Sequence, residues 1–123
     1  MEYRIEYTEQ NGKKDRLYFV FDDKLSLLTS FLDDEVSHFY ESMMADFDLV
    51  LSGKKRRHES SGNAFAWTIG PKTTKIVDMF PYSEDDDKPV VVGTTELVQL
   101  MKEWNAARKE FAEKGSAGVG LSL

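Results

Sequence analysis

The chain has 123 residues, of which 41% are apolar, and it carries a formal net charge of −6 with no cysteine. This length allows one domain around one core, and the lack of cysteine excludes disulfides, thiolate metal sites and cysteine nucleophiles. An acidic chain is repelled by nucleic-acid phosphates and by anionic lipid, so it disfavours both as partners.

No segment resembles a signal peptide, and no stretch approaches the roughly 18 apolar residues of a membrane span. Together with the absence of cysteine, this predicts a soluble cytoplasmic protein.

The first 21 residues are expected to form a β-hairpin. Residues 2–8 alternate between apolar and charged side chains, which is the period of a half-buried strand. Asn11-Gly12 is a strong turn signal because both residues tolerate positive φ. Residues 16–21 are rich in β-forming side chains and predict the second strand.

Two helices are expected next. Asp22 and Asp23 are suited to cap a short helix that contains Leu25 and Leu28, because a carboxylate accepts the free amides of a first turn. Asp33, Asp34 and Glu35 then open a longer helix, whose apolar residues recur at three- and four-residue spacing up to Leu51. Gly53 is a suitable residue to end it.

Residues 54–63 are polar throughout and predict a loop. A second hairpin follows, with strands at 64–69 and 74–80 and a turn at 70–73, and large side chains on one face of its first strand. The segment 89–92 predicts a further short strand or an apolar anchor. Apolar residues at helical spacing then predict a final helix from residue 94, ended by Gly115.

The order ββααββ(β)α predicts an α+β fold, with a mainly antiparallel sheet of four or five strands and helices packed on one face. Residues 1–114 are expected to form a single domain, and 115–123 a flexible C-terminal tail.

Three acidic clusters, at 22–23, 33–35 and 84–87, are the main candidates for function. Helix capping accounts for the first two, and a solvated loop is an ordinary role for the third. The functional hypothesis is a negative surface that contacts a basic protein. Tyr82, beside the third cluster, is a candidate aromatic anchor. The candidate partner-binding residues are Asp22, Asp23, Asp33, Asp34, Glu35, Tyr82, Glu84, Asp85, Asp86 and Asp87.

Catalysis and cofactor binding have little support in the sequence. His38 and Glu41 lie one helical turn apart, but the further ligands of a metal site are missing, and a surface histidine is the simpler interpretation. No nucleophile elbow, phosphate loop or dinucleotide motif is present. We therefore expect no enzyme, no cofactor and no metal.

The run Lys54–Arg57 supports an alternative function, an accessory protein that binds nucleic acid. The same four charges are also suited to the negative end of a helix dipole followed by a solubilising loop. The acidic net charge disfavours the nucleic-acid alternative.

The chain resembles the immunity proteins of bacterial polymorphic-toxin and contact-dependent growth-inhibition systems. The shared features are a small acidic α+β domain, an aromatic hairpin over 64–80, and a closing helix that reads Thr-Thr-Glu-Leu-x-x-Leu-x-x-x-Trp from 94 to 104. The resemblance implies a cytoplasmic inhibitor that binds a cognate toxin domain, often a basic nuclease, and blocks its active site or substrate surface. Because such proteins diverge at the binding surface, the resemblance assigns no residue.

Overall fold

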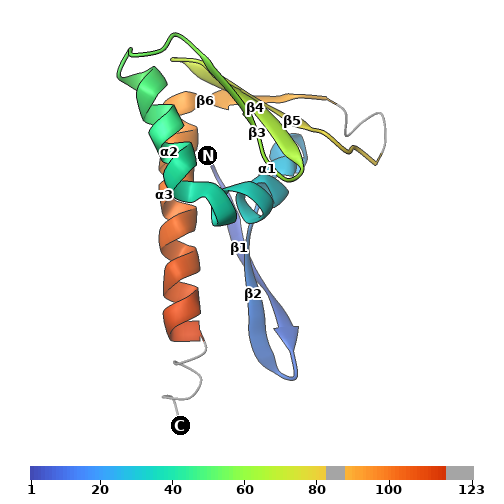
Figure 1. Ribbon diagram of the computed structural model, residues 1–123. Coiled ribbons are helices and arrows are strands. Elements are labelled where there is room, and N and C mark those ends of the chain that lie inside the picture. The colour runs from blue at the N-terminus through green and yellow to red at the C-terminus, as the bar shows by residue number, and fades with distance from the viewer. Residues whose placement is uncertain (83–87, 116–123) are drawn as a thin grey trace.

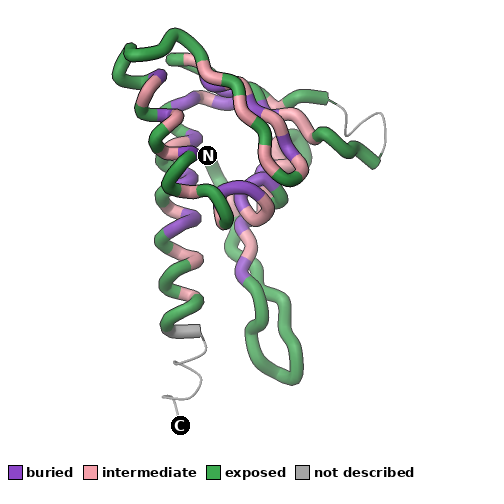
Figure 2. The backbone as a smooth tube through the Cα atoms, in the orientation of Figure 1, coloured by how far each residue is buried: buried purple, intermediate pink, exposed green. Residues whose placement is uncertain are grey.

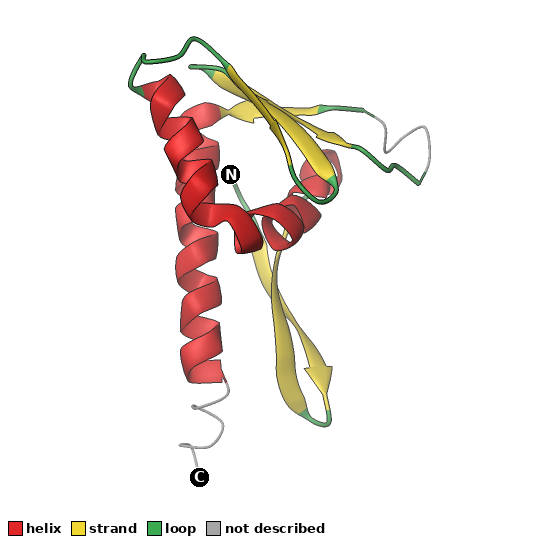
Figure 3. Cartoon of the chain, in the orientation of Figure 1, coloured by secondary structure: helices red, strands yellow, loops and turns green. Residues whose placement is uncertain are grey.

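A computed structural model of the chain describes residues 1–82 and 88–115. It is an α+β fold with two separate antiparallel sheets (Figures 1 and 3). The first sheet is the hairpin of β1 (Arg4–Gln10) and β2 (Lys13–Val20), and the second has the order β3-β4-β5-β6. The strands of the second sheet are β3 (His58–Ser61), β4 (Phe65–Ile69), β5 (Thr73–Asp78) and β6 (Val90–Gly93). The helices are α1 (Leu27–Phe31), α2 (Ser37–Leu51) and α3 (Thr94–Glu110).

The hairpin of β1 and β2 turns at Asn11 and Gly12, whose φ angles of 56° and 77° confirm the turn predicted at these residues. The connection is shorter than the expected loop of a few residues, because Gln10 already pairs with Lys13. Its outer half projects alongside the C-terminal half of α3 and is exposed (Figures 1 and 2). Its inner half enters the core through Leu17 and Phe19, which are buried. The hairpin therefore forms an arm anchored at one end.

The segment between the hairpin and α2 differs from the prediction. Asp22 precedes a 3₁₀ turn, Asp23–Leu25, but its side chain makes no capping hydrogen bond. The expected start of the long helix at residues 33–35 is instead a π-helical turn, Leu32–Val36, which joins α1 to α2 without a break. The three acids therefore do not cap a free helix end. A kink follows at Phe39, where φ is −126° and ψ is 23°.

Glu35 is fully buried, which corrects its prediction as a surface acid. Its carboxylate accepts hydrogen bonds from three backbone amides, those of Asn63, Ala64 and Phe65, at 2.7, 3.1 and 2.8 Å. These amides lead into β4 and include its first residue, Phe65, so Glu35 links the helical segment to the sheet. A Cβ added at Gly62 would overlap the Glu35 carboxylate, which explains why glycine occupies that position.

The four-stranded sheet alternates as the sequence predicts. Phe65, Trp67 and Ile69 of β4 are buried, whereas Ala66 and Thr68 on the other face are partly exposed. The predicted loop 54–63 contains β3, which pairs with β4 in register His58↔Ile69. The sequence gives no sign of this strand because its side chains show no apolar alternation. Of the two possibilities for residues 89–92, a short strand or an apolar anchor, the strand is confirmed as β6.

The core lies between the inner face of this sheet, the inner half of the hairpin and the helices. Aromatic rings connect these parts, with Phe19 edge-on to Trp104 at 5.1 Å and Phe31 edge-on to Trp67 at 5.5 Å. At the start of α3, the hydroxyl of Thr94 donates to the Gly70 carbonyl at 2.6 Å, which ties the helix to the β4–β5 turn. Within the described residues, no helix is long and apolar enough to cross a membrane.

Candidate partner-binding surfaces

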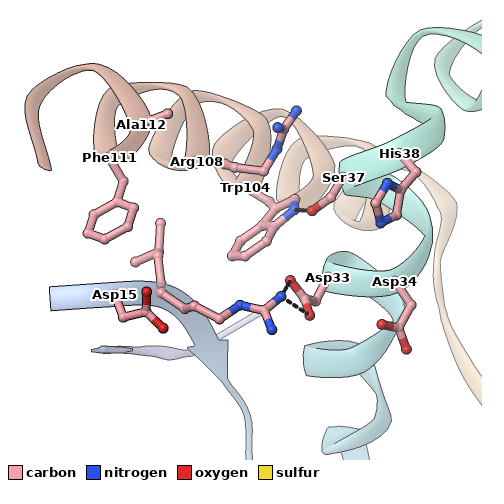
Figure 4. Close-up of a pocket in the computed structure, with 11 residues that line it drawn as sticks. Asp15, Asp33, Asp34, Ser37, His38, Trp104, Arg108, Phe111 and Ala112 are labelled. Carbon is pink, nitrogen blue, oxygen red and sulfur yellow. Dashed lines mark hydrogen bonds and ion pairs between the residues drawn. The ribbon is translucent and has the colours of Figure 1, made fainter. Parts of the chain in front are cut away.

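A pocket of about 310 Å³ opens between the hairpin arm, the start of α2 and the end of α3 (Figure 4). We call it the β2–α3 pocket. The residues that line it are Asp15, Arg16, Leu17, Asp33, Asp34, Ser37, His38, Trp104, Arg108, Phe111 and Ala112. Leu17, Trp104 and Phe111 give it an apolar wall, and charged side chains surround that wall.

Two polar contacts hold the pocket together. One guanidinium nitrogen of Arg16 donates to both oxygens of Asp33, at 3.1 and 3.3 Å (Figure 4). The Trp104 indole donates to the Ser37 hydroxyl at 3.0 Å, and that hydroxyl donates to the Leu32 carbonyl at 3.2 Å. The π-helical turn places Asp33 toward β2 and Ser37 toward α3, so local helix geometry sets the pocket's shape.

Asp34 is a partly buried acid of the pocket. Its pKa is raised, first because of partial burial and then because of the neighbouring charges of Asp33 and Glu35, while His38 and Arg16 oppose the shift. In the described parts of the chain, the carboxylates of Asp15 and Asp34 have no hydrogen bond or ion pair. The three carboxylates of the lining outnumber its two guanidiniums, those of Arg16 and Arg108, so the formal charge of the pocket is negative.

A second groove is lined by His38 and also by Glu41, the two residues that the sequence places one helical turn apart. Both side chains are exposed, and among the described residues no hydrogen bond joins them. This arrangement matches the interpretation of His38 as a surface histidine. Arg108 lies between this groove and the β2–α3 pocket and donates to Asn105 Oδ1 at 3.1 Å.

A second candidate surface, which we call the Tyr82 groove, lies between the start of the helical segment and the ends of β5 and β6. It has a volume of about 530 Å³. Its lining residues are Asp23, Lys24, Ser26, Leu27, Ser30, Phe65, Asp78, Tyr82, Lys88, Pro89 and Val90. The structure thus brings together two of the predicted residues, Asp23 and Tyr82, from segments far apart in the sequence.

Tyr82 is fully exposed and Phe80 is 69% exposed. The Asp78 carboxylate accepts the Phe80 backbone amide at 2.8 Å, which fixes the chain just before the groove. Sequence reasoning missed Phe80 because it looked like the last residue of a buried strand. Only the end of β5 at Asp78 shows that it lies outside the sheet.

Comparison with known proteins identifies a curated relative, an immunity protein of Bacillus cereus. It is 31% identical over 101 residues, which is 82% of this chain and 83% of the relative. The chain belongs to this immunity-protein family. No family model matches the chain, and no solved structure matches it.

In this immunity-family chain the predicted acids fall into separate places. Asp22 and Asp23 are exposed, and Asp23 lines the Tyr82 groove. Asp33 and Asp34 line the β2–α3 pocket, and Glu35 belongs to the core. Residues 84–87 lie outside the described residues, although the flanking Tyr82 and Lys88 both line the Tyr82 groove.

The basic run 54–57 is exposed and partly paired with its own surroundings. Lys55 Nζ lies 3.2 Å from His58 Nδ1, and Arg57 forms an ion pair with Glu59. His58 in turn lies 3.3 Å from the Asp46 carboxylate, which joins β3 to α2. Within the described part of the chain, no three His, Asp or Glu side chains are grouped as metal ligands.

Proposed function

We propose that this chain is an immunity protein that binds a cognate toxin and neutralises it. The observation that carries the proposal is its membership of the family of the Bacillus cereus immunity protein. It acts by binding rather than by catalysis, a role that the name of its Bacillus cereus relative supports. The toxin belongs to a polymorphic-toxin or contact-dependent growth-inhibition system.

The toxin domain that it binds is basic and of the nuclease type. The net charge of −6 favours a basic partner, since complementary charge accelerates association and excludes partners of like charge. The proposed contact residues are Asp22, Asp23, Asp33, Asp34, Tyr82 and the run Glu84–Asp87. Glu35 is left out because a buried, fully hydrogen-bonded carboxylate cannot reach a partner.

Growth protection tests this proposal. The toxin domain encoded immediately upstream in the same genome is expressed from one inducible promoter, and this chain from another. We expect the wild-type chain to restore growth, and a variant with Glu84 to Asp87 replaced by serine to restore it less. A chain that folds but gives no protection would refute the proposed function, as would a neighbourhood of metabolic genes without a toxin gene.

The nucleic-acid alternative is disfavoured by the surroundings of the basic run. Lys55 and Arg57 already contact His58 and Glu59, so half of the run's charges have intramolecular partners. A phosphate backbone would have to compete with those contacts and with the acidic net charge of the whole chain.

A further inference from the structure

We propose that the β2–α3 pocket receives one cationic side chain, an arginine or a lysine, of the protein that this chain binds. The inference rests on the proposed function for the identity of the partner. The size, the apolar wall and the charge of the pocket all fit such a side chain.

The size of the pocket fits a single side chain. Its volume of about 310 Å³ is at the lower limit of the roughly 300–1,000 Å³ typical of sites for small molecules and cofactors. It lies where the hairpin arm and the end of α3 come together, and the rings of Tyr7 and Phe111 meet at 5.7 Å beside it. A long, narrow group can enter between these two elements.

The wall of the pocket fits an aliphatic stem with a charged end. Leu17, Trp104 and Phe111 supply apolar and aromatic surface on one side. Arginine and lysine bury their stems along apolar surface and keep the charged end at the rim.

The charges at the rim favour a cation over an anion. The lining holds the carboxylates of Asp15, Asp33 and Asp34 against the guanidiniums of Arg16 and Arg108, so its formal charge is negative. Arg16 is paired with Asp33, whereas Arg108 donates to the neutral amide of Asn105 and its buried Nε has no acceptor among the described residues. The carboxylates of Asp15 and Asp34 have no hydrogen bond or ion pair among the described residues. An incoming guanidinium or ammonium can form an ion pair with one of these two carboxylates.

The test uses a small probe and needs no toxin. The isotope-labelled chain is titrated with N-acetyl-arginine methylamide and followed by NMR. We expect saturable shifts at Leu17, the Trp104 indole and Phe111 at millimolar concentrations. The matching glycine derivative should produce no such shifts. Asp34→Asn should weaken binding by about two- to five-fold, as expected for a partly exposed ion pair.

Asp48→Asn is the matched control, because Asp48 is an exposed acid on α2 outside the pocket. It should leave the titration unchanged. The proposal would be overturned if no saturable shifts appeared, or if the two substitutions had equal effects. It would also be overturned if N-acetyl-aspartate methylamide bound more tightly than the arginine derivative. Growth protection is measured without the probe. A chain that protects growth but does not bind the arginine derivative would therefore refute the pocket proposal alone, and not the immunity function.

Discussion

The Glu35 carboxylate accepts the backbone amide of Phe65 at 2.8 Å, across 30 residues of sequence, and both residues are buried. The amides of Asn63 and Ala64 share the same acceptor. One side chain thus accepts hydrogen bonds from three consecutive backbone amides. The junction between the helical segment and β4 depends on the Glu35 carboxylate.

Glu35→Ala should lower the free energy of unfolding by about 3 kcal/mol or more, because it leaves buried amides without an acceptor. Glu41→Ala, at an exposed position on α2, should change it by less than about 0.5 kcal/mol. Urea unfolding followed by circular dichroism measures both. Equal effects would show that the three hydrogen bonds contribute nothing to stability.

The two tryptophans should respond differently to substitution by phenylalanine. Both are buried, but the Trp104 indole donates to Ser37, whereas Trp67 Nε1 has no acceptor among the described residues. Trp104→Phe should therefore cost about 1 kcal/mol more than Trp67→Phe, the typical value of one hydrogen bond. Thermal unfolding of the two variants checks this difference, and a larger loss for Trp67→Phe would contradict it.

Stability should depend on pH in the alkaline range through Tyr3. Its hydroxyl donates to Glu103 at 2.7 Å, and burial, that hydrogen bond and the Glu103 charge raise its pKa from 10.0 to about 12. A raised pKa means that the folded chain keeps a proton that the unfolded chain releases. This contribution is fully present below pH 10 and is lost as the pH rises toward 12.

The measurement compares the wild-type chain with Tyr3→Phe, which cannot titrate at this position. The stability advantage of the wild type should shrink between pH 10 and pH 12. A constant difference across that range would mean that the Tyr3 hydroxyl is not held in the folded state as described.

Local signals were enough to predict the elements that depend on local chemistry. Asn11-Gly12 predicts its own turn, and the spacing of Leu97, Leu100 and Trp104 predicts α3. The burial of Glu35 could not be predicted, since an acid in the run Asp-Asp-Glu looks like surface until amides 28 to 30 residues away come near.

Each candidate surface is formed by segments that lie far apart in the sequence. The sequence therefore indicated single residues of these surfaces but not which residues come together. Asp33 and Asp34 were candidates, but the ion pair of Asp33 with Arg16 of β2, and the pocket that both acids line, need the folded arm. Likewise, Asp23 and Tyr82 were separate candidates until the Tyr82 groove placed them together. Strand β3 stayed hidden because it is a polar edge strand, held by pairing with β4 rather than by apolar side chains.

Tyr82→Ala should weaken toxin binding without changing the stability of the chain. The side chain is 101% exposed, so folding does not bury it, whereas an aromatic anchor at an interface commonly contributes a factor of about 10 to 30 in Kd. Leu51→Ala, at an exposed apolar residue that ends α2, is the control. If both variants bind the toxin domain as the wild type does in a calorimetric titration, Tyr82 is not an anchor.

The central claim is that this chain neutralises a toxin by binding it. The most direct measurement mixes the purified chain with the toxin domain encoded upstream and follows residual toxin activity against the molar ratio. We expect toxin activity to fall linearly to zero at one chain per toxin, with an association rate that decreases as the salt concentration increases. Full toxin activity at a several-fold excess of the folded chain would contradict it.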